Sequence, residues 1–454
     1  MNELADPAAS ELTAAADSRG IARPSGGLLV ANVIGNAGFF VSALVLARLL
    51  GPSGRGVMAF FVVSALVGSS LVSLGLTDAT SVAAARYPAR RATVLGNAVF
   101  LSSVLGLLGA GLVGVLALFR NKLPAGIDGP VLGLLAAAIL TTTVSVVASG
   151  FLRGCGRFAS YARISAVAPW LYALVLIALW IGPGLDVRRA EVAWLVYAVC
   201  GGFATLVAAL RVEGIATPDR ALARESIAFG IRAWVGSLAA MMNARVDQII
   251  MGFITTEAIL GVYSVAVNAS EVLLYLPNAI GVAFLPAIIR SDPDHRLPRT
   301  LEVLRRLTVV TVAFALVAAA IGVPLIPIVF GHAFHDSSLP FLILLPGALG
   351  YGALAVTGAA LLAAGAPQQS SLTMAVGLVV GVALDFLLVP PLGANGAATA
   401  ATTAFLASGA VGVALLHRRT PFPWREAFPG WQDVTTLARG ARAAAARPLA
   451  SIRA

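Results

Sequence analysis

Residues 152–165, LRGCGRFASYARIS, separate two stretches that are almost entirely apolar. Three arginines, Arg153, Arg157 and Arg163, surround two glycines in this short segment. A phosphate-binding loop would need a Walker pattern or a strand before the glycines, and neither is present. A basic turn between two membrane-crossing helices explains the pattern better. The same arginines could in addition contact a phosphorylated substrate at the mouth of a transport path.

The composition of the whole chain supports the membrane interpretation. Of 454 residues, 59% are hydrophobic and 11% are charged, whereas a soluble protein is about half apolar and about a quarter charged. A helix needs about 20 apolar residues to cross about 30 Å of hydrocarbon. Segments of this kind occur twelve times, at 27–47, 56–77, 93–118, 130–151, 161–182, 191–210, 227–252, 258–285, 307–330, 339–363, 370–390 and 395–416.

The basic residues predict the orientation, because cytoplasmic loops of membrane proteins collect Arg and Lys. With the N-terminus in the cytoplasm, most of the 31 basic residues fall on the cytoplasmic side. We therefore expect a multi-pass protein of the bacterial inner membrane with both termini cytoplasmic. The net charge of +10 follows from the same rule and does not indicate nucleic-acid binding. The basic residues on the outer side are Arg48, Arg55, Arg120, Lys122, Arg188 and Arg189.

Two local similarities predict an internal repeat. GRFASYARISAV (156–167) matches GAPQQSSLTMAV (365–376), and GVMAFFVVSA (56–65) matches GVYSVAVNAS (261–270), at nearly equal offsets. Six spans per half give two repeats of the same orientation, related by an axis along the membrane normal. The domain organisation that follows is a disordered N-tail, a first six-helix lobe, a cytoplasmic linker, a second six-helix lobe and a basic C-tail: 1–26, 27–211, 212–226, 227–417 and 418–454.

Several stretches together carry a family resemblance. They are LARLLGPSGRGVMAFF (46–61), LRGCGRFASYARIS (152–165), NARVDQIIMGFITTEAILGVYSVAVNASEVLLYLPNAIGVAFLPAI (243–288) and PLGANGAATAATTAF (391–405). This ordered set resembles the oligosaccharide flippases of the multidrug/oligosaccharidyl-lipid/polysaccharide exporter superfamily. The resemblance implies an all-α membrane fold of two six-helix lobes around a central cavity, and transport by alternating access. It also implies a polyprenyl-diphosphate-linked oligosaccharide as cargo, moved from the cytoplasmic to the outer leaflet for cell-surface polysaccharide assembly.

Two other members of the superfamily remain as alternatives. Cation-coupled multidrug exporters often carry an acid in the first span, but 27–47 contains Asn32 and Asn36 and no carboxylate. Lipid II flippases usually have further spans and several arginines in their first two spans, whereas only Arg48 and Arg55 lie near them here. A membrane enzyme is not expected, because the outer loops are short and lack paired carboxylates or a triad.

Charged residues inside apolar segments are candidates for function, because a charge at the bilayer centre costs about 2.5–3.5 kcal/mol on insertion scales. Guanidinium groups bind a diphosphate through paired hydrogen bonds, and a buried carboxyl can exchange a proton or cation during transport. Arg245 and Asp247 lie about 200° apart around one helix, so each needs a partner elsewhere; for Arg245 the alternative role is a structural ion pair with Glu271 or Asp385. The expected substrate-binding residues are Arg245, Arg232, Arg48, Arg55 and Arg153, and the expected ion-coupling residues are Glu271, Asp247 and Asp385.

Other features predict little chemistry. Cys155 and Cys200 lie far apart, and His332, His335 and Asp336 make a weak case for a metal, so neither a disulfide nor a metal site is expected. No cofactor is expected, and coupling to H+ or Na+ stays open. The expected partners are the lipid-linked substrate, membrane lipids and a polysaccharide polymerase or export machinery, with the transporter itself a monomer. The C-tail, with Trp424 and Trp431, could be an interfacial helix on the inner leaflet or a disordered tail.

Overall fold

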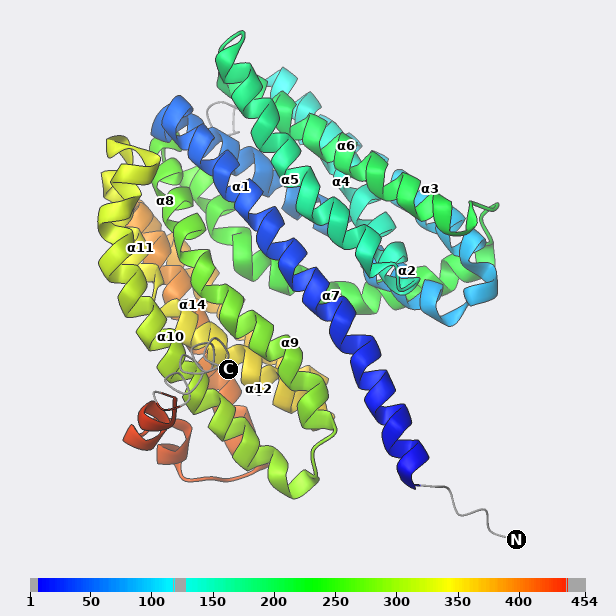
Figure 1. Ribbon diagram of the computed structural model, residues 1–454. Coiled ribbons are helices and arrows are strands. Elements are labelled where there is room, and N and C mark those ends of the chain that lie inside the picture. Colours follow the sequence, from blue (N-terminus) through cyan, green and yellow to red (C-terminus); the bar gives the residue numbers. More distant parts are fainter. Residues whose placement is uncertain (1–6, 117, 119–127, 438, 440–454) are drawn as a thin grey trace, which may run out of the picture. The chain divides into compact units, whose positions relative to one another are not determined.

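The computed structural model describes residues 7–116, 118, 128–437 and 439, with side chains from Val30 onward (Figure 1). No strand occurs in these residues. The α-helices are α1 (Pro7–Val72), α2 (Leu76–Arg86), α3 (Arg91–Leu116), α4 (Gly129–Gly154), α5 (Phe158–Ile181), α6 (Val187–Glu213), α7 (Arg220–Ile254), α8 (Glu257–Ser270), α9 (Tyr275–Ile289), α10 (Pro293–Phe330), α11 (Ser338–Leu344), α12 (Gly347–Ala363), α13 (Pro367–Leu392) and α14 (Ala394–Arg419). The structure also describes the short 3₁₀ turns η1 (Pro88–Arg90), η3 (Glu271–Leu274) and η4 (His332–Ser337) between these helices, and η5 (Trp424–Ala427) after α14.

The helices agree with the predicted spans. Within the described residues, 10 helices are long and apolar enough to cross a membrane, or 11 if the bent pair His332–Leu344 and Gly347–Ala363 counts as one span. The first of them, Val30–Val72, is 43 residues long and contains two predicted spans. Counting it twice reproduces the twelve predicted segments, so the fold is that of an all-α multi-pass membrane protein.

Helix α1 differs from the prediction in two ways. It continues through Gly51, whose backbone (φ 65°, ψ −174°) is not helical, so the expected turn between spans one and two is a sharp break without a loop. Glycine adopts this conformation without the steric cost that a Cβ would add. The helix also begins at Pro7, inside the stretch 1–26 where we expected a disordered tail. The physical reason is in the sequence, since this stretch is rich in alanine, the strongest helix former, and proline is favoured in a first helical turn. Residues 1–6 lie outside the described residues.

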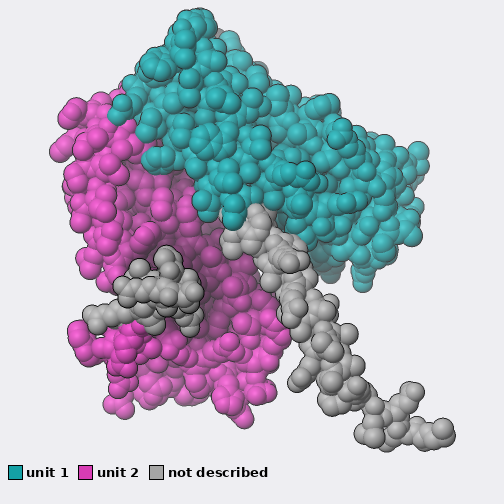
Figure 2. Space-filling model, in the orientation of Figure 1, with its two compact units in different colours: residues 1–50, 60–238 teal, residues 51–59, 239–454 magenta. Residues whose placement is uncertain are grey.

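The chain forms two compact units, shown in separate colours in Figure 2. Unit 1 consists of Met1–Leu50 and Phe60–Leu238, and unit 2 consists of Gly51–Ala59 and Ala239–Ala454. The division therefore falls within two helices, α1 and α7. The predicted repeats, 27–211 and 227–417, concern internal similarity and their limits stay predictions.

The segment between α6 and α7, predicted as the linker 212–226, is fastened within unit 1. The Asn97 side-chain amide donates to the Asp219 carbonyl at 3.1 Å and accepts from the Asp219 backbone N–H at 2.9 Å. The Ala216 N–H donates to the Ala92 carbonyl at 3.0 Å. Arg90 pairs with the Asp219 carboxylate at 3.0 Å. Because both backbone and side-chain groups hold it to the start of α3, this segment is a bonded part of unit 1.

Helices α1 and α8 meet in unit 2 through two glycines. A Cβ on Gly56 would lie 1.8 Å from the Glu257 carbonyl oxygen, and a Cβ on Gly261 would lie 1.9 Å from the Pro52 carbonyl oxygen. Each glycine thus faces the carbonyl four residues before the other. Gly56 and Gly261 are also the first residues of the matching stretches 56–65 and 261–270. A reciprocal contact of this kind is what two-fold-related elements make, and it agrees with repeats of the same orientation.

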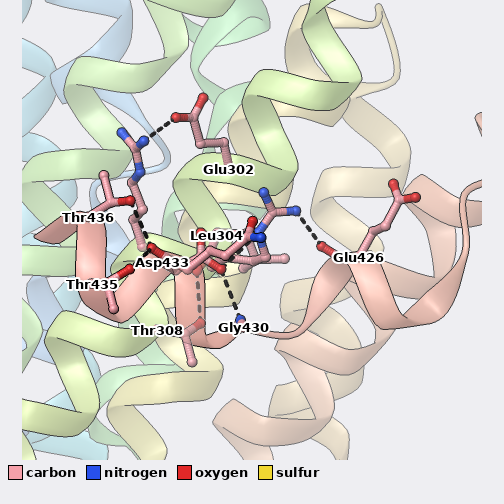
Figure 3. A network of polar contacts seen from close by, with 11 residues as sticks. Glu302, Leu304, Thr308, Glu426, Gly430, Asp433, Thr435 and Thr436 are labelled. Atoms are coloured by element: carbon pink, nitrogen blue, oxygen red, sulfur yellow. Dashed lines mark hydrogen bonds and ion pairs between the residues drawn. The ribbon is translucent and has the colours of Figure 1, made fainter.

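The described part of the C-tail folds back onto unit 2. Phe422 and Ala427 are buried among Ile288, Leu301 and Leu304 of α9 and α10. Arg305 of α10 pairs with the Asp433 carboxylate at 3.3 Å and donates to the Glu426 carbonyl at 2.8 Å. Figure 3 shows Glu426 and Asp433 of the tail beside Leu304 and Thr308 of α10. Residues 418–437 are therefore ordered here, and contact of the tail with lipid stays a prediction.

Candidate functional site

The predicted charged residues of the second half come together from three elements of unit 2. Arg245 and Asp247 lie in the part of α7 after Leu238, Glu271 begins η3, and Asp385 lies on α13. The 3₁₀ turn η3 interrupts the predicted span 258–285 at Glu271. Pro277 explains the interruption, because proline has no N–H to donate to the carbonyl four residues before it. A turn of this kind inside a spanning segment often marks a functional position.

Arg245 forms an ion pair with Glu271, whose carboxylate oxygen lies 2.7 Å from the guanidinium. The two side chains are 25% and 28% exposed, so each keeps a part of its surface accessible. The distance is that of a strong, charge-assisted hydrogen bond. The ion pair was one of the alternatives for Arg245, and it leaves room for a ligand to reach the guanidinium.

Asp247 has partners of a different kind. The Tyr263 hydroxyl of α8 donates to one carboxylate oxygen, and the Gln248 backbone N–H donates to the other at 2.7 Å. Tyr263 is fully buried. As expected from their spacing, Arg245 and Asp247 do not pair with each other but with groups on other elements.

Asp385 is the third acidic group of the site. Its side chain is 2% exposed, and Oδ1 has no hydrogen-bond partner within the described residues. Asp247 is the charged group whose field acts on it, and Asp385 in turn acts on Tyr263. Two carboxyl groups that share a water-poor region cannot both keep a negative charge without a proton or cation between them. Asp247, Tyr263 and Asp385 therefore form an acidic cluster beside the Arg245–Glu271 pair, in which Tyr263 and Asp385 are buried and Asp247 is half-buried.

The other predicted arginines make contacts of their own, and Arg48, Arg153 and Arg232 belong to unit 1. Arg232 is exposed in unit 1, where its Nε donates to the Ala228 carbonyl of its own helix at 3.0 Å. Arg153 lies at the end of α4, with its guanidinium 5.7 Å from the centre of the Tyr161 ring. Arg48 is exposed and Arg55 is buried, on either side of Gly51 in α1, and both make further contacts. The basic turn 152–165 is indeed short, since α4 ends at Gly154 and α5 begins at Phe158.

One buried acid was missed from the sequence. Glu191 of α6 is 1% exposed, although it is the first residue of the predicted span 191–210. It was not among the residues predicted from the sequence. Glu191 lies three residues before Trp194 and therefore one helical turn away from it on α6. This spacing from a large apolar side chain was the sign in the sequence that Glu191 could be buried.

The described residues contain no group of three or more His, Cys, Asp and Glu side chains placed to hold a metal ion. His335 and Asp336 lie 3.7 Å apart and are largely exposed. Cys155 and Cys200 are free thiols.

Comparison with known proteins gives this arrangement a context. The chain matches the family described as polysaccharide biosynthesis protein over residues 45–339. The chain belongs to this family. It is 22% identical over 433 residues to the probable low-salt glycan biosynthesis flippase Agl15 of Haloferax volcanii, a match that covers 92% of this chain and 88% of Agl15. It is 24% identical over 279 residues to the probable flippase AglR of the same organism, covering 59% of this chain and 56% of AglR.

Solved structures confirm the fold. An inward-facing multidrug resistance MATE family transporter of the MOP superfamily superposes with a TM-score of 0.67 at 17% identity, covering 86% of this chain and 98% of that one. The lipid II flippase MurJ in an inward closed conformation superposes with a TM-score of 0.69 at 13% identity, covering 89% and 88%. The fold expected from the resemblance is thus confirmed. The chain is a multi-pass membrane protein of the polysaccharide biosynthesis family with the fold of these transporters, and both curated relatives are named as probable flippases.

Proposed function

We propose that this transporter flips a polyprenyl-diphosphate-linked oligosaccharide from the cytoplasmic to the outer leaflet by alternating access. The observation that carries the proposal is the Arg245–Glu271 pair, a partly exposed guanidinium between two long apolar helices. A guanidinium matches a phosphate with two parallel hydrogen bonds. Family membership and the flippase relatives support the same class of cargo.

The ion pair provides a way to keep the charge of Arg245 compensated in both states. Without cargo, Glu271 neutralises Arg245, because an unpaired charge at this depth would be costly. With cargo, the diphosphate takes the place of Glu271 at the guanidinium. The displaced carboxylate then needs a proton or a cation, and the acidic cluster of Asp247 and Asp385 lies beside it. We propose that H+ or Na+ bound by these three carboxyl groups couples to cargo movement.

Reconstituted vesicles provide the test. A lipid-diphosphate-linked oligosaccharide is placed in the inner leaflet, and its arrival in the outer leaflet is measured with a glycosidase added outside. Arg245→Ala removes a hydrogen-bonded charge partner, which costs about 2 kcal/mol or more, or roughly thirtyfold in the rate at low cargo. Arg224→Ala, an exposed position on the same helix, is the matched control and keeps the rate.

Glu271→Gln separates coupling from binding. This variant cannot take up a proton or charge-compensate a cation, so movement of cargo continues but no longer responds to a pH or sodium gradient. A deletion strain supplies the cellular readout, in which lipid-linked intermediates accumulate on the cytoplasmic face. Normal export in that strain, or unchanged transport by Arg245→Ala, would refute the proposal.

A further inference from the structure

The most completely buried carboxylic acid of unit 1 is Glu191, and it plays no part in the site described above. Its side chain is 1% exposed, and neither carboxyl oxygen has a hydrogen-bond partner in the described part of the chain. An ionised carboxylate offers about four acceptor positions, and leaving all of them empty in a buried place costs several kcal/mol. These surroundings therefore favour the neutral carboxylic acid of Glu191 over the carboxylate.

Among the residues that the structure describes, the one cation within ion-pair distance of Glu191 is already engaged. Arg188 approaches Glu191 with Nε at 3.8 Å from Oε2, which is longer than the roughly 2.7–2.9 Å of a charge-assisted hydrogen bond. Its terminal nitrogen lies 2.7 Å from both oxygens of Asp128. The hydrogen bond from Arg188, followed by the one from the Val131 N–H, holds the pKa of Asp128 below its ordinary value. Asp128 is therefore the ionised partner of Arg188, and it is the residue that caps α4.

Apart from Arg188, the charged groups of the described residues that act on Glu191 are both acids, Asp128 and Asp186. Asp186, which caps α6, lies on the same side and would oppose a negative charge. Of the helices packed along α6, α3, α4 and α5 carry arginines only near the ends where α3 begins, α4 ends and α5 begins, whereas α1, which contacts α6 through Phe39 and Phe61, carries Arg48. Besides Arg188 and Glu191, the charged and titratable groups with described side chains on α6, its neighbours and α1 are Arg48, Arg55, Arg91, Arg153, Tyr161, Arg163, Tyr172, Arg189, Tyr197, Cys200, Arg211 and Glu213. Of these, Arg48, Arg55 and Tyr172 contact other groups, and Arg189 pairs with Asp186.

We propose that Glu191 is a proton-binding site of unit 1, and that loss of its proton transfers Arg188 from Asp128 to Glu191. In the arrangement seen here Glu191 is the neutral acid. When its O–H bond breaks, the proton passes to water at the Asp128 end of the helices and the carboxylate is left negative. The guanidinium, 3.8 Å away, then hydrogen-bonds to Glu191, and Asp128 turns to solvent, where it is already 58% exposed.

This exchange would connect proton binding to the packing of two helices. Arg188 now joins the N-terminus of α6 to the cap of α4, and the deprotonated state replaces that link with one inside α6. The site uses none of the residues of the acidic cluster of unit 2. The inference rests on the proposed function only for the transport step that proton binding at Glu191 would drive, because proton binding itself can be measured without cargo.

Trp194 provides a local probe. It lies one turn from Glu191, 4% exposed, with its ring 5.7 Å from that of Phe61. A neutral carboxylic acid quenches indole emission more strongly than a carboxylate does. A variant with Trp194 as its single tryptophan, with phenylalanine at the other five positions, is titrated in lipid nanodiscs. We expect its emission to rise across about pH 6 to about pH 9, the range of buried carboxyl groups, and Glu191→Gln to abolish this transition.

Two neighbouring substitutions test the exchange of Arg188. Asp128→Asn frees the guanidinium for Glu191, so the transition moves to lower pH. Arg188→Gln removes the cation, so it moves to higher pH. Glu213→Gln, an exposed acid at the opposite end of the same helix, is the matched control and keeps the transition in place within a few tenths of a pH unit.

Infrared difference spectroscopy of the otherwise unsubstituted chain provides a second measurement that does not depend on the tryptophan replacements. The carbonyl band of a protonated carboxylic acid at neutral pH should be lost in Glu191→Gln and kept in Glu213→Gln. A band and a fluorescence transition unchanged by Glu191→Gln would overturn the inference. If Glu191 titrates as described and the vesicles still move no lipid-linked oligosaccharide, the proposed function fails while the proton site stands.

Discussion

Replacing Gly56 by alanine tests the reciprocal contact between α1 and α8 in unit 2. The added Cβ would lie 1.8 Å from the Glu257 carbonyl oxygen, and the same change at Gly261 would place a Cβ 1.9 Å from the Pro52 carbonyl oxygen. Both obstructing atoms are backbone, so no side chain can turn aside and the helices must separate. Overpacking costs about 1–3 kcal/mol and occasionally more. Alanine favours the helix over glycine by up to about 1 kcal/mol, which offsets a part of this cost.

We therefore expect each substitution to lower the free energy of unfolding by about 2 kcal/mol. A single separation of the helices relieves both clashes, so the double variant should lose less than the sum of the two. Thermal unfolding in nanodiscs, followed by tryptophan fluorescence, measures both effects. Gly111→Ala on α3 is the matched control, because nothing lies within 4 Å of its added Cβ. Equal stability of Gly56→Ala and Gly111→Ala would refute the reasoning.

Three further predictions concern single contacts. Arg305→Ala removes the Arg305 contacts to Asp433 and Glu426, so hydrogen exchange in residues 420–437 should rise about tenfold, for a loss of about 1.5 kcal/mol; Arg306→Ala, which breaks only an exposed pair with Glu302, should leave it unchanged. Tyr263→Phe removes the donor to Asp247 and should lower the free energy of unfolding by about 1–3 kcal/mol, whereas a stability equal to that of Tyr275→Phe would contradict the hydrogen bond. The backbone N–H of Leu222, together with Arg90, lowers the pKa of Asp219 below 3.8, so its stabilisation is fully present above that value and is lost as the pH falls through the lowered one; unfolding of the wild type and Asp219→Asn should therefore differ at neutral pH and converge in strong acid.

The sequence predicts the spans well because the signal is local. Apolar runs of sufficient length, separated by basic turns, identify each helix without knowledge of its neighbours, and the Arg245 and Asp247 spacing alone excluded a pair between them. The choice of Glu271 over Asp385 as the partner of Arg245 depended on packing between α7 and η3, which no local pattern encodes. Pro277 does indicate a helix break near Glu271, so the position of η3 could have been predicted from the sequence.

The features that were not predicted depend on contacts between distant segments. Gly51 was read as part of an ordinary turn, yet the chain passes through it from one helix directly into the next. Glu191 was not predicted as a buried acid, because burial of the first turn of α6 is a property of the helices around it. The reach of Arg188 to the cap of α4, 60 residues earlier in the chain, has the same origin.

The crossing of Gly56 and Gly261 has a consequence for synthesis of the protein. Residues 51–59 belong to unit 2, but they leave the ribosome long before α8 does. At about 5–20 residues per second, the roughly 200 residues that separate the two glycines take about 10–40 seconds to be made. During that time the glycine surface of α1 has no native partner in its own chain. The glycine surface of α1 is thus buried only when the second unit is complete, and not when the first unit is complete. A chain truncated before residue 257 would present this surface to chaperones or to the membrane quality-control proteases.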